Sequence, residues 1–141
     1  MASLYEQNIL DRMNTCSIKD KYFYKGMCYF NGINCTKSKE LGLQCYITGS
    51  EMGSVKCKYG IAVCKLKNDG EEALNYFIEA FPGLLSEADN KDDFSQRMVS
   101  CCYYFGNRGI EKNMAQAIFL LEQAVSLGNI EAIFDLAMCY E

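Results

Sequence analysis

A cysteine recurs four times along the chain at a nearly constant spacing. The four positions are 36, 38 and 37 residues apart: Cys28, Cys64, Cys102 and Cys139. Two positions before each cysteine lies a small residue: Gly26, Ala62, Ser100 and Ala137. Periods of about 20–50 residues are typical of proteins built from stacked repeats. We therefore expect a solenoid in which each repeat contacts its neighbours.

Small residues seven positions apart form a second recurring feature, offset from the first. The pairs are Gly42 and Gly49, Ala73 and Ala80, and Ala117 and Ala124. Seven residues are about two turns of an α-helix, so each pair lies on one helix face, where another helix must approach closely. Glycine-containing turns at residues 31–33, 68–70 and 106–110 separate the two features. Each repeat is thus predicted to be an αα-hairpin.

The helices are expected at residues 3–16, 20–30, 37–50, 54–66, 70–81, 95–104, 113–127 and 130–140. Proline has no amide hydrogen and clashes with the preceding turn, so Pro82 is expected to end the fifth helix and leave residues 83–93 as an irregular loop. The first helix, with Ser3 as its N-cap, has no repeat signature. We expect residues 1–19 to cap the first hairpin; the alternative is a partner-binding or self-inhibiting arm.

The combined pattern resembles the Sel-one-like repeat, a relative of the tetratricopeptide repeat. It consists of a small residue, two further positions, a tyrosine, a glycine-containing turn and a helix with alanines seven apart. The period near 37 differs from the period of about 34 in tetratricopeptide repeats. The resemblance covers residues 21–141, although Lys65 replaces the expected tyrosine in the middle repeat.

The resemblance implies an all-α fold, a right-handed αα-superhelix of about three and a half repeats. These repeats would span residues 20–53, 54–93, 94–129 and, as a half repeat, 130–141. It also implies a scaffold that gathers partner proteins in the manner of the family. It implies no reaction.

Composition excludes several classes of function. The net charge of −4 argues against nucleic-acid binding, which needs a clustered basic surface. No run of 18 apolar residues exists to span a membrane. The chain has no histidine, so a Ser-His or Cys-His nucleophilic site is impossible. We expect no catalytic residue, no cofactor and no metal, and a cytoplasmic location, because neither a signal peptide nor a transit peptide is visible.

The nine cysteines allow three interpretations. A zinc site would need clustered ligands such as paired C-x-x-C, which the sequence lacks. Disulfides would need Cα atoms within about 7 Å, which helical spacing makes difficult for the recurring cysteines. We therefore expect reduced cysteines that fill tight helix contacts. If disulfides were present, the mitochondrial intermembrane space or another oxidising organelle would be the alternative location.

A partner-binding groove is expected on the side of the first helices that faces away from the core. Spacing residues by 100° places eight on this side: Phe23, Met27, Tyr59, Val63, Arg97, Cys101, Phe134 and Met138. Seven of the eight are apolar, which is typical of an interface for another protein. If the assumed register is wrong by one residue, some of them belong to the core.

Two functions remain open. The first is a non-enzymatic scaffold or assembly subunit that holds a partner segment, or a subunit of a larger assembly, in this groove. The second is a thiol-based redox or enzymatic protein that uses an exposed cysteine such as Cys101, its pKa lowered by Arg97. The last helix stops before its hairpin partner, so we also expect either a longer array or an end-to-end contact through this helix.

Overall fold

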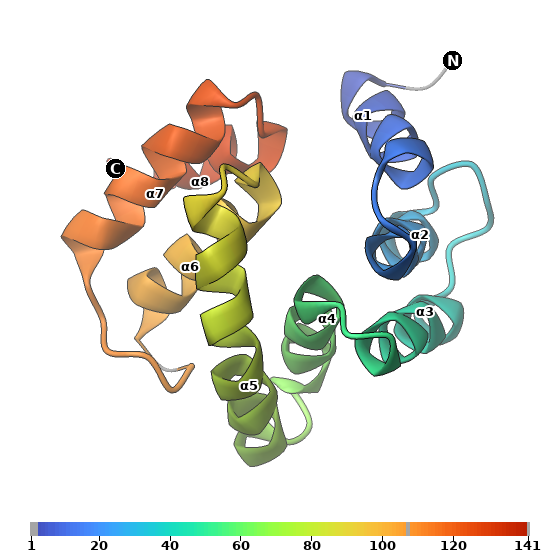
Figure 1. The fold of residues 1–141 in the computed structure, drawn as a ribbon, viewed down its shortest axis with the longest axis horizontal. Coiled ribbons are helices and arrows are strands. Elements are labelled where there is room, and N and C mark those ends of the chain that lie inside the picture. Colours follow the sequence, from blue (N-terminus) through green and yellow to red (C-terminus); the bar gives the residue numbers. More distant parts are fainter. Residues whose placement is uncertain (1–2, 107, 141) are drawn as a thin grey trace. The chain divides into compact units, whose positions relative to one another are not determined.

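The computed structural model describes residues 3–106 and 108–140, which form helices joined by turns and short irregular connections. The helices are α1 (Leu4–Thr15), α2 (Ile18–Asn31), α3 (Lys39–Glu51), α4 (Val55–Lys65), α5 (Gly70–Asp89), α6 (Asp93–Phe105), α7 (Met114–Ser126) and α8 (Ile130–Cys139) (Figure 1). Eight helices and no strand in this part of the chain confirm the all-α prediction. Residue 107 of the predicted turn at 106–110 lies outside the described residues.

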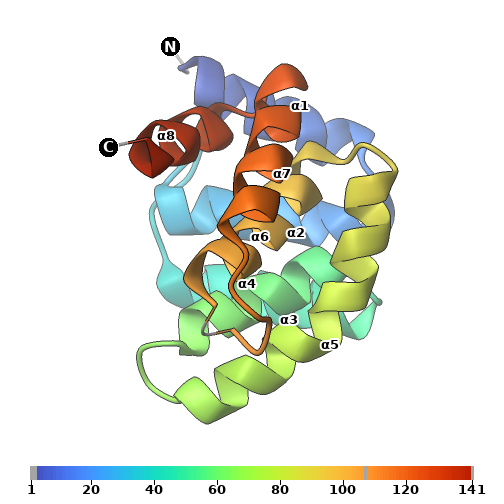
Figure 2. The same ribbon diagram turned by 90° about the vertical axis from the view of Figure 1, so that its left-hand side faces the viewer.

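The chain divides into two compact units, residues 1–76 and 77–141, and α5 contributes residues to both. In the first unit α1 packs against α2, α2 against α3, and α3 against α4. In the second unit α6 packs against α7, and α7 against α8 (Figure 2). The pairs α2–α3 and α6–α7 are therefore the predicted αα-hairpins, each followed by the first helix of the next repeat.

N-cap side chains account for where most of the helices begin. Seven side chains directly before a helix accept a hydrogen bond from the backbone amide three residues later: Ser3, Ser38, Ser54, Asp69, Asp92, Asn113 and Asn129. Each such cap gives a hydrogen-bond acceptor to an amide that has no partner within the helix. It stabilises the helix by about 0.5–2 kcal/mol.

The turns that connect one repeat to the next share a backbone geometry. Three hydrogen bonds close them: Ser54 N to Gly49 O (2.9 Å), Asp92 N to Glu87 O (3.1 Å) and Asn129 N to Ala124 O (3.0 Å). The residue before each N-cap has a positive φ: Gly53 (96°), Lys91 (66°) and Gly128 (88°). This arrangement is a glycine-type helix C-cap, and only the middle repeat fills it with a residue that carries a side chain.

Lys91→Gly is expected to stabilise the protein by about 0.5–1 kcal/mol. A side chain in the left-handed region costs about 1–2 kcal/mol, part of which the greater freedom of glycine in the unfolded chain offsets. Gly128→Ala is the matched control and should destabilise the protein by about 1 kcal/mol, because alanine is strained at this positive φ. The added Cβ meets no atom within 4 Å, so no steric clash contributes. Urea unfolding followed by circular dichroism measures both; a destabilised Lys91→Gly would contradict this account.

The prediction that Pro82 ends the fifth helix is wrong. Helix α5 continues through Pro82 to Asp89, so residues 83–89 are helical, not an irregular loop. The apolar stripe explains why: Phe77, Ala80, Leu84 and Ala88 are all buried at helical spacing on both sides of the proline. Pro82 itself lies on the exposed side. Burial of the stripe therefore outweighs the one hydrogen bond that proline removes.

The small residues of the second helices are buried, as predicted. Ala73, Ala80, Ala117 and Ala124 have no exposed surface. At Gly42, an added Cβ would lie 2.6 Å from the Phe30 ring, a distance that Cβ atoms in folded proteins essentially never show. The columns of small residues thus mark the points where side chains from a neighbouring helix fill the space above the backbone.

Tyr46 of α3 occupies the space between two glycines of the first unit. An added Cβ at Gly26 of α2 would lie 2.5 Å from its ring, and one at Gly60 of α4 would lie 2.7 Å from it. The ring also stacks on Phe23 (centroids 5.8 Å apart) and packs against Phe30 (5.2 Å). One aromatic side chain therefore joins all three helices.

Polar side chains join consecutive repeats inside each unit. In the first unit the Asp20 carboxylate accepts hydrogen bonds from Ser54 Oγ (2.8 Å) and Lys56 Nζ (3.2 Å). In the second unit Asp93 Oδ2 accepts one from Asn129 Nδ2 (3.0 Å). Both acids lie in the first turn of a first helix, and Ser54 and Asn129 are N-caps of the next first helix. Each repeat thus holds the start of the following one.

Candidate functional site

The predicted groove residues of the first unit do not share one surface. Phe23, Met27 and Tyr59 are only 4%, 8% and 8% exposed, so the expectation that they face solvent is wrong. The Phe23 ring is covered by Tyr46, which fills the space between α2 and α4. Val63 of α4 is exposed. The register assumed for the groove is therefore wrong in the first unit. There the Tyr46 ring of α3 packs against Phe23, which belongs to the core.

In the second unit the predicted residues lie differently. Phe134 and Met138 on α8 are 68% and 63% exposed. Arg97 and Cys101 on α6 are half-buried. The role of these four residues in binding a partner stays a prediction. Two of them, Cys101 and Met138, line a cavity.

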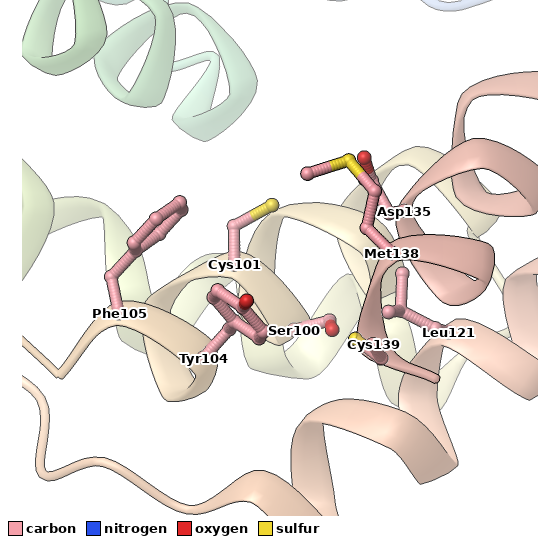
Figure 3. Close-up of a pocket in the computed structure, with 8 residues that line it drawn as sticks. All are labelled: Ser100, Cys101, Tyr104, Phe105, Leu121, Asp135, Met138 and Cys139. Atoms are coloured by element: carbon pink, nitrogen blue, oxygen red, sulfur yellow. The ribbon is translucent and has the colours of Figure 1, made fainter. Parts of the chain in front are cut away.

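A small cavity opens between α6, α7 and α8. Its volume is about 60 Å³, and its lining is Ser100, Cys101, Tyr104, Phe105, Leu121, Asp135, Met138 and Cys139. The side chains of Cys101 and Met138 extend from α6 and α8 toward the same space, and Phe105 points to the same side of α6 (Figure 3). A cavity needs about 10–15 Å³ to hold one water, so this one has room for a small apolar group. We call it the α6–α8 pocket.

Ion pairs between the two first helices fix the geometry beside this pocket. Arg97 of α6 donates from Nε to Asp135 Oδ2 (2.6 Å) and pairs through NH1 with Glu131 Oε2 (2.8 Å), both on α8. Burial acts to lower the pKa of Arg97, but the negative charge of Glu131 leads the interactions that raise it above its usual value. Arg97 is therefore a link between repeats, and its charge is opposed by two carboxylates.

The nine cysteines are free thiols. Burial raises the pKa of Cys57 and of Cys102 to about 12. Burial also raises the pKa of Cys28, Cys45 and Cys64. A raised pKa keeps a thiol protonated and unreactive at neutral pH. Over the described residues, no group of three or more His, Cys, Asp or Glu side chains could hold a metal ion.

Stability should fall at alkaline pH because of these thiols. The pKa of Cys57 is about 12 in the folded protein against 9.0 ordinarily, so above pH 9 the unfolded chain releases this proton and the folded chain keeps it. Unfolding is then favoured as the pH rises from 9 to 12, and the stability that Cys57 contributes is complete below pH 9. Urea titrations at pH 7 and pH 10 should show a smaller loss in Cys57→Ala than in the unchanged protein. An equal loss would contradict the burial of this thiol.

A second cavity, of about 170 Å³, lies in the first unit. It is lined by Leu10, Met13, Lys25, Cys28, Tyr29, Ile33, Asn34 and Cys35. Leu10 and Met13 belong to α1, so the N-terminal helix forms one wall against α2 and the turn that follows it. Cys28 and Tyr29 belong to the repeat pattern, but Leu10 and Met13 of α1 do not, so the repeats alone do not predict this cavity. No helix among the described residues is both long and apolar enough to cross a bilayer.

Comparison with known proteins identifies the repeats. The model of the Sel1 repeat matches residues 22–54, 57–81, 94–129 and 130–141. The chain is also similar to the crystal structure of a Sel1 repeat protein from Oxalobacter formigenes, with 20% identity and a TM-score of 0.53; the match covers 96% of this chain and 53% of that one. At this identity the likeness concerns the fold. A search of curated proteins gave no match. Because the matched residues make up well over half of the sequence, the chain belongs to the Sel1 repeat family.

Proposed function

We propose that the protein is a non-enzymatic scaffold that binds a segment of another protein across α6 and α8. Sel1 repeats generally mediate protein–protein interactions. The observation that carries the choice of surface is the α6–α8 pocket, whose lining includes the exposed side chains of Phe105 and Met138. Phe134, one turn before Met138 on α8, is also exposed. Exposed aromatic and methionine side chains around a small apolar pocket are the features that anchor partner segments.

The thiol-redox alternative gains no support. Its premise was that Arg97 activates Cys101, but the Arg97 guanidinium is held by Glu131 and Asp135. Arg97 and Cys101 do interact electrostatically, but the negative charges of Glu131 and Asp135 oppose the positive charge of the guanidinium. Cys101 is better described as part of the lining of the pocket.

Site-specific photo-crosslinking tests the proposed surface. A benzoylphenylalanine placed at Met138 is expected to form a covalent adduct with a partner in the native cell. The same group at Phe119 is the matched control, because Phe119 is 52% exposed on α7 and does not line the pocket. Adducts at 119 and none at 138 would place the partner elsewhere. An adduct at 138 with the mass of two copies of this chain would instead support the end-to-end contact through α8.

We also propose a cytoplasmic location, in keeping with nine free thiols. Subcellular fractionation of the native source, with the chain detected by antibody, tests it. Recovery in an oxidising organelle with disulfides present would contradict it.

A further inference from the structure

Charge is distributed unevenly between the two units. Residues 1–76 contain ten lysines and arginines and eight acidic residues, whereas residues 77–141 contain four and ten. The second unit thus carries a net charge of −6, although the whole chain carries −4. A surface with one predominant sign attracts partners of the opposite sign and speeds their association.

Both arginines of the second unit are engaged within its fold. Arg97 is paired with Glu131 and Asp135. Arg108 is buried with its guanidinium carbon 4.8 Å from the centroid of the Phe77 ring and 4.7 Å from that of Phe105. The two lysines of this unit, Lys91 and Lys112, are exposed but do not line the α6–α8 pocket. An acidic partner at the pocket would therefore have to compete with the contacts of Arg97.

The charge immediately beside the α6–α8 pocket is also negative. One guanidinium faces two carboxylates there, and Asp135 lines the pocket itself. The rest of the lining is mainly apolar, and Ser100 Oγ already donates to Ala117 O (2.7 Å) within the fold. A ligand of this pocket gains from an apolar group inside it and a positive charge at its edge.

We infer that the α6–α8 pocket binds a basic amphipathic segment of another protein, with an aliphatic or methionine side chain in the pocket and lysines or arginines beside Glu131 and Asp135. This inference rests on the proposed function and specifies the chemistry of the partner. Apolar anchors with adjacent basic residues are a common form of helix recognition in hydrophobic grooves. The charges contribute selectivity and the apolar side chain contributes the contact area.

Two synthetic peptides test the inference by fluorescence anisotropy with the whole chain. Both carry leucines at helical positions i, i+3, i+4 and i+7; one has lysines at the remaining charged positions and the other has glutamates. The lysine peptide should bind about tenfold more tightly at low salt, with a difference that shrinks as salt screens the charges. Met138→Ser should weaken its binding about tenfold, and Phe119→Ser, an exposed change of the same kind outside the pocket, should not.

Three results would overturn the inference, and they differ in whether the proposed binding surface is still supported. Equal binding of the lysine peptide by Met138→Ser and the unchanged chain would mean attraction by net charge alone. Equal binding of both peptides, with both weakened by Met138→Ser, would refute the basic partner while keeping the proposed surface. Binding of neither peptide would also refute the basic partner, and crosslinking at Met138 would then decide the proposed function independently.

Discussion

Asp20→Ala is expected to destabilise the first unit by about 3–5 kcal/mol. Lys56 is 1% exposed, and its ammonium group lies 3.2 Å from the Asp20 carboxylate. Lys56 is also in the first turn of α4, where the helix dipole disfavours a positive charge. When one member of a buried ion pair is removed, the charge of the other stays buried without that compensation. The resulting loss of folding free energy is far larger than the net contribution of the pair itself. Thermal unfolding by circular dichroism, with hydrogen exchange to localise the effect, measures the loss.

The double variant Asp20→Ala with Lys56→Met is the control. It removes the buried charge together with its partner, so it should recover a large part of the lost stability. Asp93→Ala, at the matching junction of the second unit, should cost only about 1–3 kcal/mol, since Asn129 is neutral. Equal losses for Asp20→Ala and the double variant would show that the burial of the ammonium group is not the cause.

Tyr46→Ala is expected to cost about 3–5 kcal/mol, the range for removing a large aromatic side chain from a core. Tyr46 is 7% exposed and its ring lies between Gly26 and Gly60, so its removal leaves a void shared by α2, α3 and α4. Tyr46→Phe keeps the ring and should cost much less. Comparable losses for the two variants, measured by urea unfolding, would contradict the role of the ring.

Gly60→Ala provides a sharper test because its sign should depend on Tyr46. In the unchanged protein the added methyl group meets the Tyr46 ring at 2.7 Å, so overpacking should destabilise by about 1–3 kcal/mol. In the Tyr46→Ala background that clash is gone, and the higher helix propensity of alanine should stabilise α4 by about 1 kcal/mol. A double-mutant cycle measures this change of sign. An additive result would mean that the two residues do not touch.

The sequence predicted the repeats well because small residues leave a periodic trace. A second helix can approach closely only above Gly or Ala, so Ala117 and Ala124 recur at fixed positions whatever surrounds them. The prediction at Pro82 was wrong because it considered only the hydrogen bond that proline removes. The apolar side chains from Phe77 to Ala88 are buried on both sides of the proline and keep the helix continuous.

The candidate site was only partly predictable. Of the four residues predicted in the second unit, Cys101 and Met138 line the α6–α8 pocket, and Arg97 pairs with Asp135 of its lining. Phe134 is exposed on α8 and is not part of the lining. The role of all four in binding a partner stays a prediction.

Phe23 is buried under Tyr46, which lies four residues after Gly42, as the buried Phe77 and Leu121 lie four residues after Ala73 and Ala117. The prediction considered only the small residues of these helices and not this large residue between them. The sequence did not predict the contacts of Arg97 with α8, although Asp135 lies 38 residues later, about one repeat length away. The repeat length shows which positions correspond, but not which side chains of adjacent helices meet.

The links from Asp20 to Ser54 and from Asp93 to Asn129 have a direction along the chain. In each, the acceptor precedes its donor, by 34 and 36 residues respectively. Beginning a helix is the costly step of its formation, because several residues are fixed before the first internal hydrogen bond is gained. During synthesis the carboxylate leaves the ribosome before the N-cap that binds it. Each finished repeat can therefore act as a template on which the first turn of its successor forms.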